Sequence, residues 1–149
     1  MGGDTLGGII YSCWPGGTVT YDYKQKARER SLDSLRELSH MAEEYDINYC
    51  LEIVNRYEQY LLNTAAEGVD FVRELDSPKV KLLLDCFHMN IEEDSFSEAI
   101  KTAGELLGHF HIGECNRKVP GRGHMEWDDM IRGLRDIDYS GKIVMEPFV

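Results

Sequence analysis

The chain alternates short apolar runs with longer amphipathic stretches. Five short runs predict strands, at residues 5–11, 47–54, 79–85, 109–113 and 142–146. These runs are too short for helices and read as buried strands. Four stretches with apolar residues at helical spacing predict helices, at 22–45, 64–77, 96–107 and 127–137. Strict alternation of strand and helix predicts an α/β fold with a parallel sheet and right-handed crossovers.

Several residues mark the ends of the predicted helices. Asn63 or Thr64 caps the second helix, which stops before Pro78 and turns Ala66 inward. A capping-box pattern at 95–98 opens the third helix. We expect Gly108 to end it. No linker or repeat divides the 149 residues, so the sequence predicts a single domain.

Four predicted strands end in a polar residue. These residues are Glu52, Asp85, His111 and Glu146. Because function gathers at the carboxyl ends of parallel strands, we expect the four side chains to meet. Three carboxylates and one imidazole suit Mn²⁺, Co²⁺ or Mg²⁺ better than a sulfur-bound Zn²⁺. Ordinary ion pairs at buried strand ends are the alternative. His109 shares the strand face of His111, and we expect it to be a hydrogen-bonded interior histidine.

Other polar and aromatic residues follow the strand ends. His88 is predicted to stand beside the metal, or else to be a solvated loop histidine. Glu58 and Arg117 are placed to hydrogen-bond a polyol, or to form salt bridges within loops. Trp14 and Phe148 are placed to wall a sugar pocket, or to pack as ordinary aromatics.

Composition and charge restrict the partners. The formal net charge of −11 argues against nucleic acid and against anionic membrane surfaces. The four cysteines form no C-x-x-C pair, so we expect free thiols in a reducing compartment. The sequence shows no membrane-spanning run and no signal-peptide pattern. We therefore expect a cytoplasmic protein.

Four segments together resemble a known family. They are residues 51–58 (LEIVNRYE), 84–94 (LDCFHMNIEED), 109–117 (HFHIGECNR) and 144–148 (VMEPF). They look like the D-tagatose and D-psicose (allulose) 3-epimerases, the ketose 3-epimerases of the xylose isomerase-like TIM-barrel superfamily. The resemblance runs from near Gly7 to the last residue. The intervals between the four strand-end residues agree with those of the family.

The resemblance implies a reaction and a role for each site residue. It implies Mn²⁺ or Co²⁺, with Mg²⁺ as a further candidate, held by Glu52, Asp85, His111 and Glu146. It implies that Glu52 and Glu146 also act as acid and base, that Glu58, His88 and Arg117 hold substrate hydroxyls, and that Trp14 and Phe148 line an apolar pocket. The implied reaction is epimerisation of a free ketohexose at C3 through an enediolate, D-psicose with D-fructose or D-tagatose with D-sorbose. Aldose–ketose isomerisation by a related enzyme and a catalytically inactive half-barrel fragment are the alternatives.

The resemblance also implies an incomplete barrel. Members of the family have eight β/α units, whereas five strands and four helices are predicted here. Residues 1–149 therefore match the C-terminal part of a TIM barrel, without the first three β/α units and the last helix. Such a piece exposes the edge of its first strand and an apolar interior face. We expect a homo-oligomer, or pairing with a missing N-terminal half-barrel.

Overall fold

The computed structural model describes residues 2–148 and contains one sheet of five parallel strands. The strands are β1 (Thr5–Gly8), β2 (Asn48–Ile53), β3 (Val80–Asp85), β4 (Leu107–Ile112) and β5 (Lys142–Met145). They lie in the sheet in the order of the sequence, and each neighbouring pair is parallel. The structure thus confirms the predicted parallel α/β architecture.

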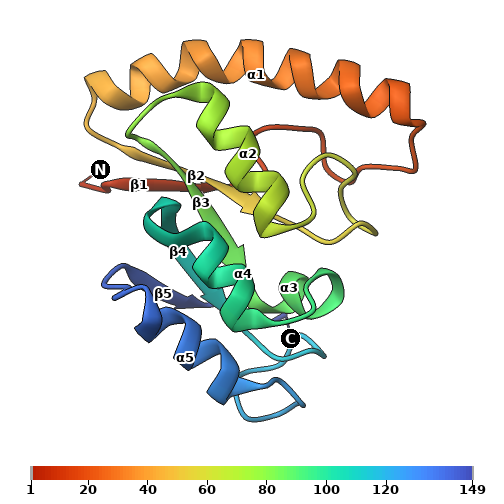
Figure 1. The fold of residues 1–149 in the computed structure, drawn as a ribbon, viewed down its shortest axis with the longest axis vertical. Coiled ribbons are helices and arrows are strands. Elements are labelled where there is room, and N and C mark those ends of the chain that lie inside the picture. The colour runs from red at the N-terminus through yellow and green to blue at the C-terminus, as the bar shows by residue number, and fades with distance from the viewer. Residues whose placement is uncertain (1, 149) are drawn as a thin grey trace.

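Five α-helices accompany the strands. They are α1 (Tyr21–Glu44), α2 (Ala65–Leu75), α3 (Cys86–Glu92), α4 (Phe96–Ala103) and α5 (Trp127–Asp136), with a 3₁₀ turn η1 (Gly104–Leu106) after α4. Figure 1 shows α1, α2, α4 and α5 along the outside of the curled sheet, following the order of the strands. These four are the predicted crossover helices. This arrangement is an open part of a TIM barrel.

Helix α3 was not predicted. It begins directly after β3, and the Asp85 carboxylate caps it by accepting a hydrogen bond from the Phe87 N–H (2.7 Å). This short helix turns His88 back toward the sheet.

Three predicted details of the helices and strands were wrong. Helix α4 ends at Gly104, whose φ of 50° an L-residue rarely adopts, and not at Gly108. Gly108 lies in β4, where a Cβ atom would come within 2.8 Å of the Cys50 sulfur. Strand β1 stops at Gly8 instead of continuing to residue 11. In α2, whose N-cap is Thr64, Ala65 is buried, whereas Ala66, which was predicted to face inward, is exposed.

The two faces of the sheet differ in chemistry because side chains alternate along each strand. Ile53 and Leu82 point outward, against Gly68 of α2, and belong to the hydrophobic core. The register pairs Asp85 with His111, which places both on the inner face. The expected apolar interior face is found only in part: Leu83 and Val144 lie on it, paired with Glu52 and His111. The inner face carries the polar strand-end residues, and the core lies between the sheet and the helices.

Exposed apolar side chains gather instead at the two edges of the layer of helices. Beside β1 they are Leu6, Leu38, Met41 and Tyr45, which line a groove with Ile47 and Tyr49. Beside β5 they are Ile131 and Ile143, which line a second groove with Leu134 and Tyr139. Leu38, Met41 and Tyr45 are thus exposed, although they belong to the apolar stripe of α1. They lie beside β1, which is the edge strand of the sheet, so no further strand among the described residues covers them.

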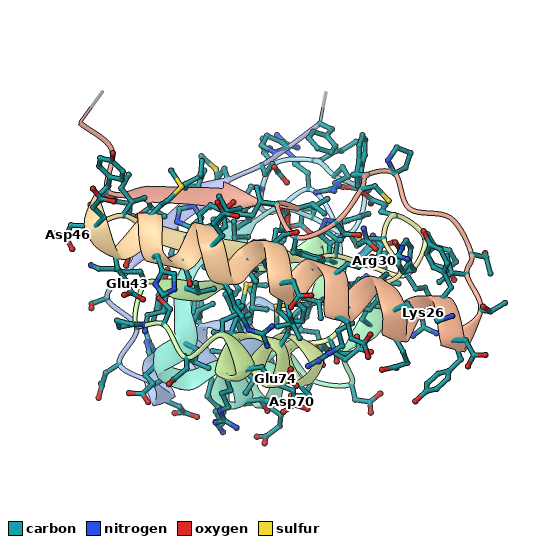
Figure 2. All side chains as sticks on the ribbon, turned by 90° about the horizontal axis from the view of Figure 1, so that it is seen from above. Lys26, Arg30, Glu43, Asp46, Asp70 and Glu74 are labelled. Atoms are coloured by element: carbon teal, nitrogen blue, oxygen red, sulfur yellow. The ribbon has the colours of Figure 1, made fainter. Side chains whose placement is uncertain are left out.

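Most charged residues of α1 are exposed, while Lys24 and Arg28 are half-buried in ion pairs with Glu67 and Glu74 of α2. Figure 2 shows Lys26, Arg30 and Glu43 projecting from α1, and all three are exposed. All four cysteines are free thiols. Among residues 2–148, none of the helices combines the length and the apolar character that crossing a bilayer requires.

Candidate metal centre

The four strand-end side chains meet at one point. Glu52 comes from β2, Asp85 ends β3, and His111 comes from β4. Glu146 follows β5, where its N–H donates to the carbonyl of Ile112 (3.0 Å). One potential ligand atom from each of the four lies within 4.8 Å of the others. The positions of these residues at the carboxyl ends of neighbouring parallel strands account for this convergence.

His111 lies at the centre of the three carboxylates. Its Nδ1 lies 3.9 Å from oxygens of Glu52 and Asp85 and 3.7 Å from an oxygen of Glu146. This nitrogen is buried and has no hydrogen-bond partner among the described residues. Buried polar atoms without a partner are rare in native structures. The donor set of one nitrogen and three carboxylate groups fits a divalent cation with borderline or hard preferences.

The carboxylates are electrostatically crowded. Burial, with the nearby charges of Glu146 and Asp85, raises the pKa of Glu52 to about 8. Burial raises the pKa of Asp85 to about 7. Burial also lowers the pKa of His111, which keeps the imidazole neutral. A divalent cation would favour all the ionised forms at once, so the site chemistry suits one.

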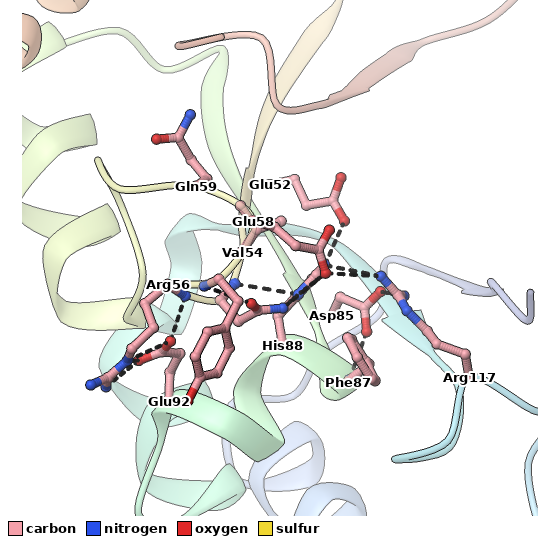
Figure 3. A network of polar contacts seen from close by, with 12 residues as sticks. Glu52, Val54, Arg56, Glu58, Gln59, Asp85, Phe87, His88, Glu92 and Arg117 are labelled. Atoms are coloured by element: carbon pink, nitrogen blue, oxygen red, sulfur yellow. Dashed lines mark hydrogen bonds and ion pairs between the residues drawn. The ribbon is translucent and has the colours of Figure 1, made fainter. Parts of the chain in front are cut away.

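Arg117 is the basic side chain that reaches this cluster from the loop after β4. Its Nη1 donates to Asp85 Oδ2 (3.4 Å) and to Glu146 Oε2 (3.3 Å). Its Nη2 lies 3.4 Å from His88 Nε2 and 3.9 Å from Glu58 Oε1. Figure 3 shows the guanidinium pointing toward Asp85, Glu58 and His88. Arg117 therefore connects the candidate ligands to the residues predicted to contact a sugar.

His88 is buried on α3 and is not a solvated loop histidine. The N–H of Asn55 donates to His88 Nδ1 (3.3 Å), and Nδ2 of Asn55 lies 2.7 Å from the same nitrogen. Its Nε2 lies 3.8 Å from Glu52 Oε1 and 3.4 Å from Arg117 Nη2. Burial lowers the pKa of His88 to about 4, so the ring is neutral at physiological pH.

Glu58 and Trp14 lie together at the rim. Trp14 Nε1 donates to Glu58 Oε2 (3.4 Å), while the other carboxylate oxygen accepts from Asn55 Nδ2 (3.0 Å). The backbone N–H of Gly16 donates to the Glu58 carbonyl (2.7 Å). Gln59 adds a second tie, because its amide donates to the Cys13 carbonyl (2.6 Å). These hydrogen bonds therefore connect the loop after β1 to the loop after β2.

Sequence reasoning missed Asn55, Gln59 and Phe87. Asn55 and Gln59 are almost fully buried, although both lie in a polar stretch that reads as a surface loop. Phe87 lies against Arg117, as described below. Their one signal in the sequence is proximity to the predicted site residues Glu58, Asp85 and His88.

His109 lies on the inner face beside His111, with the two ring centroids 5.1 Å apart. Its Nδ1 is buried and has no hydrogen-bond partner among residues 2–148. The expected hydrogen bond of this interior histidine is therefore not present. His109 is not one of the four candidate ligands.

Comparisons with known proteins agree on one family. Residues 3–149 match the xylose isomerase-like TIM barrel family. The D-psicose 3-epimerase of Ruminiclostridium cellulolyticum is 56% identical over 145 residues, which are 97% of this chain and 49% of that protein. The L-ribulose 3-epimerase of Methylomonas sp. is 37% identical over 148 residues, 99% of this chain and 51% of that protein.

Solved structures give the same result. The D-psicose 3-epimerase from Clostridium cellulolyticum H10, crystallised with D-tagatose, superposes with a TM-score of 0.92 at 53% identity, covering 97% of this chain and 50% of that one. The 3-keto-D-glucoside 4-epimerase from E. coli gives a TM-score of 0.86 at 30% identity, covering 97% of this chain and 56% of that one. The chain thus spans about half the length of the curated relatives that it matches. It belongs to the xylose isomerase-like TIM barrel family.

Proposed function

We propose that this chain is the C-terminal part of a ketose 3-epimerase, which inverts C3 of a free ketohexose in a metal-dependent reaction. The observation that carries the proposal is the meeting of Glu52 and Glu146 at one point with Asp85 and His111. The similarity to D-psicose and L-ribulose 3-epimerases supports the choice of reaction. D-Fructose with D-psicose, or D-tagatose with D-sorbose, are the proposed substrate pairs.

Glu52, Asp85, His111 and Glu146 are proposed to hold the metal. The unpartnered Nδ1 of His111 and the raised pKa values of Glu52 and Asp85 support this assignment. We propose Mn²⁺ or Co²⁺, with Mg²⁺ as the third candidate. When bound, the ion would polarise the substrate carbonyl and stabilise the negative charge that develops when a proton leaves C3.

The two glutamates are proposed to move the proton. The two glutamates belong to different strand ends. Glu52 Oε1 lies 3.9 Å and Glu146 Oε2 lies 3.7 Å from His111 Nδ1. One carboxylate takes the proton from C3, and the other returns a proton to the opposite face, which inverts the carbon. Burial raises the pKa of Glu52 to about 8 in the metal-free site, and a bound cation would favour the ionised form, which can accept the C3 proton.

The residues around the cluster are proposed to hold the sugar. Glu58, His88 and Arg117 present a carboxylate, an imidazole and a guanidinium toward the same region, and we assign them to substrate hydroxyls. Trp14 and Phe148 are 60% and 62% exposed, so their rings are available to cover the apolar face of a sugar. Trp14 is held in place by its hydrogen bond to Glu58.

We further propose that the site works within a completed barrel. Strands β1 and β5 are the two edges of the sheet, and each has an apolar groove beside it. Unpaired edges and contiguous apolar surface mark places where a protein is covered by another body. Additional β/α units, supplied by a missing N-terminal half-barrel or by a second copy, would cover both. Cytoplasmic localisation stays a prediction.

The test is an assay with D-fructose and D-tagatose in the presence of Mn²⁺ or Co²⁺. We expect D-psicose and D-sorbose as the respective products, and no product after treatment with EDTA. The assay is run on the chain alone and on the chain combined with the N-terminal half of the R. cellulolyticum relative. An aldose as the sole product would assign the site to aldose–ketose isomerisation. No product from either preparation would favour an inactive fragment.

A further inference from the structure

The guanidinium of Arg117 lies close to two phenyl rings. Its central carbon is 3.9 Å from the centroid of Phe87 and 4.4 Å from the centroid of Phe148. Both distances are within the range in which a cation is attracted to an aromatic face. The N–H groups of a guanidinium lie in its own plane, so a ring against its face leaves them available as hydrogen-bond donors. Arg117 uses that edge for Asp85 and Glu146.

The backbone of Arg117 is fixed independently of its side chain. Its φ is 60°, in the left-handed region that arginine rarely adopts. Its N–H donates to the Glu114 carbonyl (2.8 Å), and its carbonyl accepts from the N–H of Phe148 (2.9 Å). The Glu114 side chain is itself buried and accepts from the N–H of Gly121 (2.6 Å) and from Trp127 Nε1 (3.0 Å). An unfavoured conformation persists at a site where its surroundings determine it.

Each ring lies two residues after a candidate metal ligand. Phe87 lies two residues after Asp85, and its N–H is bound by the Asp85 carboxylate (2.7 Å). Phe148 lies two residues after Glu146, whose Oε2 accepts from Arg117. The stack is therefore built from three different strand ends, those of β3, β4 and β5.

We infer that Phe87 is a positioning residue, which together with Phe148 holds the Arg117 guanidinium with its N–H edge toward the substrate. This inference rests on the proposed function for the identity of the substrate. An arginine side chain has many rotamers, and ordering them only when the sugar binds would weaken binding. Phe87 is the less exposed of the two rings, so its loss is expected to have the larger effect.

The first test reads the stack without any catalysis. The Nε–H signal of Arg117 is recorded by NMR on ¹⁵N-labelled protein and assigned by its loss in Arg117→Lys. Protons over the faces of two rings are shifted upfield, so we expect the signal upfield of the exposed arginines. Phe87→Leu should move it downfield, while Phe87→Tyr, which keeps the ring, should leave it in place. An Arg117 signal that Phe87→Leu does not move overturns the inference, whatever the protein catalyses.

The second test measures kinetics of the active preparation. We expect Phe87→Leu to raise the KM for the ketose about tenfold, the size expected for a partly buried cation–π contact, and to change kcat less than threefold. Phe87→Tyr should restore KM. Phe71→Leu is the matched control, because Phe71 also lies near an arginine, Arg28 at 5.3 Å, but away from the site. That variant should lose stability and keep its KM. An unchanged KM in Phe87→Leu, or an equal rise in Phe71→Leu, would contradict the positioning role.

Discussion

His111 Nδ1 is the atom on which the metal site depends at the scale of single residues. It is buried without a hydrogen-bond partner among the described residues and faces oxygens of Glu52, Asp85 and Glu146. No side chain other than Arg117 brings a positive charge to these carboxylates in the contacts described above. A cation at this point would give every one of these groups a partner.

We predict that the protein binds one Mn²⁺ per chain. His111→Ala and Asp85→Asn should each weaken binding at least tenfold, because each removes a ligand or its charge. His40→Ala is the matched control, since His40 is exposed on α1 far along the chain from the cluster. Isothermal titration with MnCl₂ measures the affinity and the stoichiometry. Equal affinity in His111→Ala and His40→Ala would exclude the proposed site.

The raised carboxylate pKa values predict how stability depends on pH. Glu52 and Asp85 keep protons up to about pH 8 and about pH 7 in the folded state, whereas unfolded carboxyls lose them near pH 4. The folded state thus binds more protons between pH 6.5 and 8, so the metal-free protein should lose stability as pH rises through this range. The lowered pKa values of His88 and His111 act in the opposite direction only below about pH 6.5.

Thermal unfolding in EDTA at pH 6.5, 7.5 and 8.5 checks this prediction. Each proton involved contributes on the order of 1 kcal/mol per pH unit. Glu52→Gln should flatten the dependence, because it removes the group with the highest of these pKa values. Mn²⁺ should raise Tm more at pH 8.5 than at pH 6.5, since it binds the deprotonated carboxylates. A Tm that rises with pH in EDTA would show that folding does not raise the pKa values of these carboxylates.

Single residues differ in how far the sequence predicts them. Glu52 and Asp85 were predictable because a carboxylate at the end of a buried strand needs a partner. The burial of His88 was not, because it depends on α3, whose capping by Asp85 follows from a side-chain contact. Phe87 reads as an ordinary apolar residue until its distance to Arg117 is known.

At the scale of elements, the loops after β1 and β2 depend on Gln59. Its amide donates to the Cys13 carbonyl, and its Oε1 accepts from the N–H groups of Tyr60 (2.5 Å) and Leu61 (2.8 Å). The side chain is fully buried. This one residue therefore supports both the loop that carries Trp14 and the loop that carries Glu58.

We predict that Gln59→Leu destabilises the protein by about 2 kcal/mol or more, because it leaves buried N–H and C=O groups unsatisfied. Chemical denaturation measures the loss. Gln25→Leu, at an exposed position of α1, should change stability by less than about 0.5 kcal/mol. A similar loss in both variants would mean that the hydrogen bonds of Gln59 contribute little.

The elements themselves were largely predictable from hydrophobic periodicity. The pattern predicts α1 within one residue of its ends, because its caps and apolar stripe agree. It fails at the end of α4, where the choice between Gly104 and Gly108 depends on the packing of Gly108 against Cys50. Such packing between neighbouring strands leaves no trace in the local sequence.

At the scale of the whole molecule, the sheet has two open edges with apolar grooves. Leu6 and Met41 are 52% and 49% exposed beside β1, and Ile143 and Met145 are 49% and 61% exposed beside β5. We predict that the isolated chain self-associates. Leu6→Glu with Ile143→Glu should increase the fraction of monomer, because charges at exposed edges oppose pairing. The affinity for Mn²⁺ should be unchanged.

Analytical ultracentrifugation of the parent chain and of this double variant checks the prediction. Lys26→Glu alone, at an exposed position of α1, controls for the added negative charge, because it changes the net charge by the same amount as the double variant. A parent chain that sediments as a single stable monomer would contradict it. The open barrel was predictable from the number of strands, but the position of its apolar surface beside the helices required the structure.

Deuterium exchange at C3 tests most directly whether this centre inverts a ketose with two glutamates. The Mn²⁺-loaded active preparation, with the parent chain, Glu52→Gln or Glu146→Gln, is incubated in D₂O with D-fructose and separately with D-psicose. A glutamine still offers an oxygen to the metal but cannot accept a proton near neutral pH. The parent should yield both sugars with deuterium at C3. Each variant should stop epimerising, and one should place deuterium in unepimerised D-fructose, the other in unepimerised D-psicose. Epimerisation at near the parental rate in both variants would contradict the two-base account.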